Sequence, residues 1–370
     1  MASIDETHMR RALELARRGW GSVSPNPMVG ALVLRDGEVA GEGWYRGPRG
    51  EPHAEVHALR QAGDRAQGAT LVCTLEPCDH TGGTPPCTRA LIDAGIARVV
   101  AAATDPNPVV DGRGFARLRQ AGIEVETGLL EHEATALNVA FERHVKTGRP
   151  FVVLKMAASL DGKTAARDGT SRWITGEGAR ADGHHLRAWS DAVVVGAGTA
   201  IADDPALTAR GPGADGARQP LRVVVDAAGR VASTLRLFDG AAPTLVATTE
   251  RASRPHIDRW AGAGADVVVL DADADGGVSL LSLVEELGKR DVQGVVIEGG
   301  ASLAFSAVRD GLVDRVVAYV APMLVGGSTA PTMLSGDGFA PIGEALRLGP
   351  LTVSLIDDDL KVVADVHGHR

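Results

Sequence analysis

Three potential zinc ligands and one acidic side chain lie between positions 53 and 87. His53, Cys78 and Cys87 supply one imidazole and two thiolates, which fill three corners of a zinc tetrahedron. A catalytic zinc keeps its fourth corner for water. Glu55 follows His53 by two residues, and a carboxylate that does not bind the metal can carry a proton for that water. The pattern therefore predicts hydrolytic chemistry rather than a closed structural zinc site.

The order H-x-E, then P-C, then a later cysteine suits deamination. A water activated by the metal attacks an amino-bearing ring carbon, and the glutamate passes a proton to the departing ammonia. Two alternatives use the same segment. His53 and His57 have the spacing of a zinc protease, but that site needs glutamate where this chain has Ala54. His80 as a fourth ligand would close the site, and Glu55 would then have no purpose.

The composition indicates a globular enzyme of two domains. The chain has 370 residues, of which 44% are hydrophobic and 23% charged, and its net charge is -9. We expect no membrane span, no signal peptide and no general affinity for nucleic acid, and we expect a cytoplasmic protein. The three cysteines are too few for a disulfide framework, and Cys73 is predicted to be a core residue of a strand.

Local signals predict how the ligands are positioned. Pro52 predicts a helix that begins near His53. The run 69–75 predicts a strand that delivers Cys78, and Pro77-Cys78 is expected to open a second helix, where the helix dipole favours a thiolate. Asn26 stands between two prolines, so its backbone is restricted and its amide is suited to reading the edge of a heterocycle.

Helical and strand patterns alternate up to Gly148, which predicts a mostly parallel sheet covered by helices. Helices are expected at 88–94, 114–121 and 129–146, and strands at 98–103 and 123–126. Thr147-Gly148 ends the last helix, so we place a domain boundary there, with one domain at 1–148 and a second at 149–370.

The second domain has the same alternation. Strands are expected at 151–155, 193–195, 222–225, 244–247, 265–270 and 295–297, with a helix at 179–189 and an antiparallel hairpin within 346–366. The loop Gly196–Thr199 lacks the third glycine of a dinucleotide fingerprint. Glu298-Gly299-Gly300 leads into a helix whose first N–H groups could hold phosphate. Lys155 and Glu298 end predicted strands, where functional side chains gather.

Taken in order, the motifs resemble the family of bifunctional riboflavin-biosynthesis deaminase-reductases over nearly the whole chain. They are S-P-N-P-M-V-G at 24–30, H-A-E at 53–55, T-L-E-P-C at 74–78, T-P-P-C at 84–87, D-P-N-P at 105–108, S-L-D-G at 159–162, R-W-I-T at 172–175, A-D-D-P-A-L-T at 202–208 and E-G-G at 298–300. The resemblance implies an α/β protein with an N-terminal cytidine-deaminase-like zinc domain and a C-terminal dihydrofolate-reductase-like domain.

The resemblance also implies the reactions and the residues that carry them. The first domain would remove ammonia from a diaminopyrimidinone ribosylamine 5-phosphate with Zn²⁺, and the second would reduce the ribosyl group to ribityl with NADPH, in a homo-oligomer. The implied catalytic residues are Glu55, Lys155, Asp203 and Glu298. The implied substrate contacts are Asn26, His80, Ser171, Leu207, Arg210 and Glu298. The implied cofactor contacts are Ala157, Trp173, Thr199, Asp203, Gly300, Ala301 and Ser302. Among these, Arg210 has the fork-shaped cation that a sugar phosphate needs.

Two positions depart from the family pattern. Tyr45 stands where the family usually has histidine, and Gly83 stands where a basic residue is usual before Thr84. Arg46 or Arg49 is the expected replacement for that cation. These departures leave two alternatives to the bifunctional enzyme: an active reductase whose deaminase domain has weakened or altered substrate choice, and a ligand sensor without catalysis.

Overall fold

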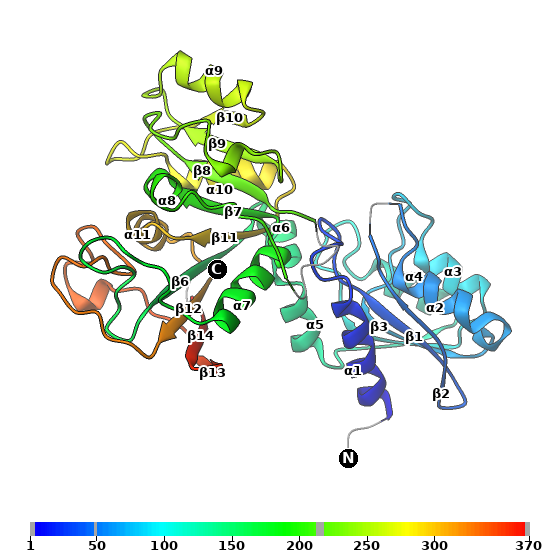
Figure 1. Cartoon of the computed structure of the whole chain (residues 1–370). Coiled ribbons are helices and arrows are strands. Elements are labelled where there is room, and N and C mark those ends of the chain that lie inside the picture. The colour runs from blue at the N-terminus through cyan, green and yellow to red at the C-terminus, as the bar shows by residue number, and fades with distance from the viewer. Residues whose placement is uncertain (1–3, 48–49, 212–217, 367–370) are drawn as a thin grey trace. The chain divides into compact units, whose positions relative to one another are not determined.

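The computed structural model describes residues 4–47, 50–211 and 218–366. The chain divides into two compact units, Met1–Gly148 and Arg149–Arg370 (Figure 1). Within the described part of the chain, no helix is both long enough and apolar enough to cross a membrane.

The first unit is built on a five-stranded sheet with the order β2-β1-β3-β4-β5. Its strands are β1 (Gly30–Arg35), β2 (Glu38–Trp44), β3 (Thr70–Leu75), β4 (Arg98–Ala103) and β5 (Glu124–Thr127). β1 pairs antiparallel with β2 through the turn at Asp36-Gly37 and antiparallel with β3, whereas β3, β4 and β5 are parallel. The predicted parallel arrangement is thus confirmed for these last three strands.

Helices cover both faces of this sheet. They are α1 (Ile4–Arg17), α2 (Ala54–Ala62), α3 (Cys87–Asp93), α4 (Arg113–Gln120), α5 (Glu131–Leu137) and α6 (Val139–Thr147), with a 3₁₀ turn at Gly63–Ala66. Side chains alternate along each strand, so neighbours in sequence face opposite layers. On β3, Leu71 and Cys73 pack with α2, α3 and α4, and Val72 packs with α1. Cys73 is fully buried, as predicted for a core residue.

Two predicted helices of this unit are wrong. Pro77-Cys78 lies in a loop, and the next helix, α3, begins only at Cys87, after the Pro85-Pro86 pair. The stretch 129–146 forms two helices, because the buried Asn138 interrupts it. The Asn138 side chain accepts a hydrogen bond from the Met28 N–H (2.8 Å) and donates one to the Met28 carbonyl (2.9 Å), which ties this break to the first loop of the unit.

The second unit contains a nine-stranded sheet within the described residues, ordered β10-β9-β8-β7-β11-β6-β12-β14-β13. Its strands are β6 (Phe151–Ser159), β7 (Ala192–Gly196), β8 (Leu221–Val225), β9 (Thr244–Thr248), β10 (Asp266–Val269), β11 (Gly294–Glu298), β12 (Arg315–Ala321), β13 (Thr352–Ile356) and β14 (Asp359–Asp365). The seven strands from β10 to β12 are parallel, and the predicted antiparallel hairpin, β13–β14, extends the sheet beyond β12. The sequence pattern did not reveal β12.

The helices of this unit are α7 (Glu177–Trp189), α8 (Ala197–Asp203), α9 (Arg254–Gly262), α10 (Leu280–Lys289) and α11 (Ala301–Arg309), with short 3₁₀ turns at Arg236–Phe238 and Ile342–Glu344. Alternate residues of the central strands, such as Val152 and Leu154, pack with α10 and α11. The other face of β7 packs with α8. Lys155 and Glu298 are therefore on the face opposite α10 and α11.

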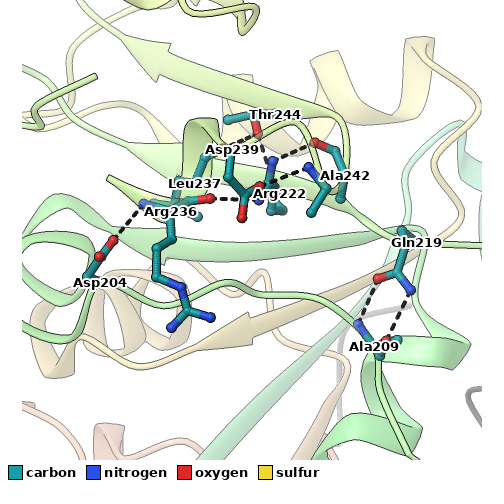
Figure 2. A network of polar contacts seen from close by, with 10 residues as sticks. Asp204, Ala209, Gln219, Arg222, Arg236, Leu237, Asp239, Ala242 and Thr244 are labelled. Atoms are coloured by element: carbon teal, nitrogen blue, oxygen red, sulfur yellow. Dashed lines mark hydrogen bonds and ion pairs between the residues drawn. The ribbon is translucent and has the colours of Figure 1, made fainter. Parts of the chain in front are cut away.

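A buried arginine stabilises the sheet next to the β8–β9 connection. The Arg222 side chain is fully buried, donates to Thr244 Oγ1 (3.1 Å) and to the carbonyls of Arg236 and Ala242 (3.0 and 2.6 Å), and pairs with Asp239 (2.8 Å; Figure 2). Because its donors are satisfied in this way, the charge can be buried without an orphaned group.

Candidate active sites

The three predicted metal ligands come together in the first unit. One donor atom from each of His53, Cys78 and Cys87 lies within 4.8 Å of the others. His53 Nδ1 is 3.5 Å from Cys78 Sγ and 3.2 Å from Cys87 Sγ. Hydrogen bonding from Cys87 and from His53 lowers the pKa of Cys78 to about 4. This one-imidazole, two-thiolate set is of the type that holds catalytic zinc. Among the described residues, His80 is not part of the group.

Glu55 faces the same cavity. Its side chain is 3% exposed, and within the described part of the chain its Oε2 is buried without a hydrogen-bond partner. Burial raises the pKa of Glu55. A buried carboxylate oxygen without a protein partner calls for a ligand or water beside it. The donor set and this orphaned atom both fit a zinc-bound water.

Close packing of α2 on β2 places His53 and Glu55. His53 is the residue before α2, and Glu55 is in its first turn, as predicted. Gly43 on β2 allows this approach, because a Cβ there would lie 2.1 Å from the Ala54 carbonyl oxygen. Cys87 is the first residue of α3, so the helix N-terminus expected at Cys78 lies at Cys87 instead. The hydrogen bond between the two sulfur atoms nevertheless raises the pKa of Cys87 and lowers that of Cys78.

Glu76 anchors the loop that closes the other side of the cavity. Its buried carboxylate accepts hydrogen bonds from four backbone N–H groups. The donors are Asp105 (3.2 Å), Gly112 (2.9 Å), Gly114 (2.9 Å) and Phe115 (3.3 Å). Glu76 is two residues before Cys78, so these hydrogen bonds fix the loop that carries Cys78 against the loop after β4.

The cavity has a volume of about 200 Å³ and is lined by Asn26, Tyr45, His53, Glu55, Cys78 and His80, with others. Asn26 Nδ2 donates to the Tyr45 hydroxyl (2.9 Å), and the Tyr45 ring meets the His53 ring edge-on at 5.7 Å. Tyr45 therefore packs between a predicted substrate contact and a metal ligand. The predicted residues Asn26 and His80 both reach the cavity.

Asp105 and Asn107 also line this cavity, although neither was predicted as a site residue. Burial raises the pKa of Asp105 to about 6. The D-P-N-P motif at 105–108, which contains both residues, was the feature of the sequence that could have indicated a role for them. The side chains lining the cavity in the described structure include no lysine or arginine. Arg46 lies with its guanidinium 4.4 Å from the Trp44 ring and does not line the cavity, and Arg49 is outside the described residues.

The second unit brings Lys155 and Glu298 together on adjacent parallel strands. Glu298 ends β11, but β6 continues past Lys155 to Ser159, so the prediction that Lys155 ends its strand is wrong. The two residues are paired in the register of β6 and β11. Glu298 accepts two hydrogen bonds from Arg187 of α7, from Nε and Nη2, each at 2.7 Å. Arg187 also donates to the Thr208 carbonyl at 3.3 Å. Neither Lys155 nor Glu298 is an exposed strand end. Arg187 was missed by the sequence analysis because its partner lies far away in the chain.

These charges determine one another's protonation. Burial by itself raises the pKa of Glu298, but the positive charges of Arg187 and Lys155 outweigh it and lower the value to about 2. Burial lowers the pKa of Lys155, and the charge of Arg187 lowers it further against the attraction of Glu298. Glu298 is thus an anion near neutral pH, and Lys155, whose pKa is lowered, is the group of the pair that still carries a proton to give.

Two glycine turns meet beside this cluster. A Cβ on Gly299 would lie 3.2 Å from Thr199 Cγ2, and one on Gly300 would lie 3.3 Å from Thr199 Oγ1. Gly300 has φ +81° and is the residue before α11, whose first residues are Ala301 and Ser302. The predicted cofactor residues Thr199, Gly300, Ala301 and Ser302 therefore surround one turn with a close backbone approach and a helix N-terminus.

The other predicted reductase residues lie on the segment before α7, at the end of α8 and on β6. The Arg172 guanidinium donates to the Asp203 carbonyl (3.1 Å), which joins the segment of Ser171 and Trp173 to the end of α8. The Trp173 side chain is 66% exposed, with Arg180 over its ring at 4.5 Å. Ala157 lies on β6, where it is paired with Tyr319 of β12.

Gln219 fixes the loop that carries Leu207 and Arg210. It accepts from the Ala209 N–H (2.9 Å) and donates to the Ala209 carbonyl (3.0 Å; Figure 2). The Leu207 side chain packs in the core next to α8, so only its main chain is left for a ligand. Arg210 is exposed, and its charge contributes to lowering the pKa of His184, an effect due first to burial and then to Arg187.

Comparisons with known proteins match both parts of the chain. A family model described as the RibD C-terminal domain matches residues 150–362, and one described as the cytidine and deoxycytidylate deaminase zinc-binding region matches residues 2–103. Riboflavin biosynthesis protein RibD of Bacillus amyloliquefaciens is 44% identical over 362 residues, which cover 98% of this chain and 96% of that protein. The chain belongs to the RibD family. RibD of Escherichia coli (strain K12) is 46% identical over 87% of this chain and 89% of its own length.

Solved RibD structures have the same fold. Acinetobacter baumannii RibD, form 1, is 40% identical and matches with a TM-score of 0.89 over 99% of each chain. The diaminohydroxyphosphoribosylaminopyrimidine deaminase/5-amino-6-(5-phosphoribosylamino)uracil reductase of Thermotoga maritima is 37% identical, with a TM-score of 0.85 over 98% of this chain and 99% of that one. The predicted fold class is confirmed, and this RibD-family chain is a riboflavin-biosynthesis enzyme with a deaminase and a reductase domain.

Proposed function

We propose that the first unit, residues 1–148, is a zinc-dependent deaminase of diaminohydroxyphosphoribosylaminopyrimidine. The observation that carries this proposal is the orphaned Glu55 carboxylate oxygen in the cavity beside His53, Cys78 and Cys87. His53 Nδ1 and the two thiolates would hold the zinc ion, which supplies an acidified water at neutral pH.

Within this unit, Glu55 moves the proton. It accepts a proton from the attacking water and delivers it to the amino nitrogen, so that the ring C–N bond breaks and ammonia leaves while the new C–O bond remains. The raised pKa of Glu55 suits a group that must both accept and donate. Asn26 and His80, which line the cavity, orient the pyrimidine by its polar edge.

We propose that the second unit, residues 149–370, reduces the ribosyl group of the deaminated product to a ribityl chain. NADPH supplies the hydride when bound. Thr199 and the turn Gly300–Ser302 bind the cofactor, together with Ala157, Trp173 and Asp203. The supporting observation is the close approach of the Gly299-Gly300 turn to Thr199, which leaves backbone N–H groups at the start of α11 for phosphate.

Lys155 is the proton donor of this reduction in our proposal. Glu298 is held as an anion by Arg187, so it orients Lys155 and substrate hydroxyl groups but does not itself supply a proton. Arg210, with Ser171 and the main chain of Leu207, binds the phosphorylated sugar.

The lining of the first cavity favours one alternative. In this alternative the reductase is active, but the deaminase domain has a weakened or altered choice of substrate. The described side chains that line its cavity include neither lysine nor arginine to bind a substrate phosphate. Mass spectrometry of the product distinguishes the two. With zinc-loaded protein and the diamino substrate, we expect the deaminated compound without NADPH and the ribityl compound with it. Unchanged substrate, together with reduction of supplied deaminated compound, would support the alternative.

We also infer that the protein is a homo-oligomer. β13 is at the edge of the nine-stranded sheet, and Leu351, Val353 and Leu355 are 59%, 56% and 70% exposed on it or just before it. Apolar side chains on a sheet edge favour association with a second copy. Light scattering after size exclusion is expected to show a dimer or larger, and Val353→Lys to shift it towards the monomer. A monomeric wild-type protein would contradict the inference.

A further inference from the structure

A second polar cluster lies beside Lys155 and has no part in the proposed chemistry. Tyr319, in the middle of β12, is 1% exposed, and its hydroxyl donates to Asp182 Oδ2 at 2.5 Å. Lys361 of β14 pairs with the same Asp182 oxygen at 2.6 Å. A helix and two strands thus meet on one carboxylate, which holds the phenol in one position.

The Tyr319 ring forms one wall around Lys155. Lys155 Nζ lies 5.5 Å from the centre of this ring. In the register of β6 and β12, Lys155 is paired with Val317, and Tyr319 is paired with Ala157. Tyr319 is two residues after Val317 on β12, so Tyr319 and Lys155 are on the same face of the sheet. From above, α7 approaches at Gly183, where a Cβ would lie 3.8 Å from Lys155 Cε. The Tyr319 ring and α7 therefore restrict the conformations of the Lys155 side chain.

A tyrosine here does more than fill space. A phenylalanine would fill nearly the same volume without burying a hydroxyl next to a carboxylate, so the hydrogen bond to Asp182 has a use other than packing. An aromatic face attracts an ammonium group, and it does so more strongly where water is excluded. Because Asp182 and Lys361 prevent the ring from turning away, this attraction acts in a fixed direction.

The titratable and charged groups around Lys155 come from the elements packed against it. β11 contributes Glu298, α7 contributes Arg187, His184 and Asp182, and β14 contributes Lys361. Glu298 attracts the ammonium group from one side, and the Tyr319 ring attracts it from another. Arg187 repels it. The position of Lys155 is the balance of these interactions.

We propose that Tyr319, held by Asp182 and Lys361, is a positioning residue of the reductase that keeps the Lys155 ammonium group directed at the reacting sugar. This inference rests on the proposed role of Lys155 as proton donor. Loss of the ring would remove a stabilising partner of the cation. Reduction would then become slower, and the pH above which Lys155 is deprotonated would fall.

The test is the pH profile of kcat for NADPH oxidation by the full-length chain with the deaminated substrate. For Tyr319→Leu we expect kcat to fall at least tenfold, the alkaline limb to move to lower pH, and KM for NADPH to stay within twofold. Tyr319→Phe keeps the ring but loses its tether, so we expect a smaller fall in kcat and no shift of the limb. Asp365→Asn, which removes an exposed ion pair between the same strands β12 and β14, is the matched control and should leave the profile unchanged.

Two results separate this inference from the proposed function. A wild-type kcat and alkaline limb in Tyr319→Leu, while Lys155→Met is inactive, overturns the positioning role alone. Full activity of Lys155→Met overturns the proposed role of Lys155 and the inference with it. Circular dichroism shows whether Tyr319→Leu folds. If it does not fold, Tyr319→Phe is the test variant, and a wild-type kcat in Tyr319→Phe overturns the proposal.

Discussion

The pair formed by Arg187 and Glu298 provides a stability prediction whose size follows from the structure. The two side chains are 17% and 10% exposed and share two hydrogen bonds of 2.7 Å. Their surroundings lower the pKa of Glu298 from its ordinary 4.5 to about 2. This difference corresponds to about 3 kcal/mol of folding free energy at neutral pH. The removal of one partner from a buried pair costs a similar ~3–5 kcal/mol.

We therefore expect Glu298→Gln to destabilise the second unit by about 3 kcal/mol at pH 7. The amide keeps the shape of the carboxylate but leaves the Arg187 charge buried and unpaired. Because the pKa of Glu298 is lower in the folded protein than in the unfolded chain, this stabilisation is present above about pH 4.5 and is lost as the pH falls towards about 2.

Hydrogen exchange of the β6 and β11 amides, followed by mass spectrometry, measures the second unit separately. Protection in Glu298→Gln should fall roughly a hundredfold. Arg187→Met/Glu298→Gln should recover part of it, because the buried Arg187 charge is then removed together with its partner. The exposed pair Arg315–Asp365 is the control, and its double-mutant cycle should give a coupling of less than about 1 kcal/mol. A cost below about 1 kcal/mol for Glu298→Gln, or no coupling with Arg187, would refute the reasoning.

Three further predictions concern the first unit. Cys87→Ser removes one thiolate, so dialysed protein should lose its zinc by elemental analysis, whereas Cys73→Ser, outside the ligand set, should retain it. Glu76→Gln weakens four hydrogen bonds from backbone N–H groups. The free energy of opening of the loop 105–115, measured by hydrogen exchange, should fall by about 2 kcal/mol, and unchanged protection there would contradict this. The pKa of Asp105, raised by burial to about 6, means that its ionisation disfavours folding as the pH rises. The stability of Asp105→Asn relative to wild type should thus increase by about 2 kcal/mol between about pH 4.5 and about pH 7.5, and a constant difference would contradict the assignment.

Local patterns were sufficient for the elements that deliver the metal ligands. The strand before Cys78, the helix after His53 and the parallel strands that carry Lys155 and Glu298 follow from short apolar runs and their flanking prolines and glycines, although β6 runs past Lys155 to Ser159. The helix expected at Pro77-Cys78 is wrong because the next two prolines, Pro85-Pro86, start the helix at Cys87 instead.

Contacts between distant segments were not predictable from the same patterns. Asn138 breaks a helix because it bonds to Met28, which is 110 residues earlier in the chain. Arg187 and Glu298 are 111 residues apart, so neither one reveals its partner. Asp182 meets Tyr319 only because α7 crosses β12. Each depends on tertiary packing, which carries no signal in a local window.

The most direct test of the central claim is ammonia release from diaminohydroxyphosphoribosylaminopyrimidine by zinc-loaded protein in the absence of NADPH. Wild type should release ammonia. Glu55→Gln should be slower by about 10²–10⁴-fold while its zinc content is unchanged, since the variant keeps the ligands and loses the proton carrier. Equal rates for the two proteins would contradict the role of Glu55. No release by the wild type would mean that the first unit does not act on this substrate.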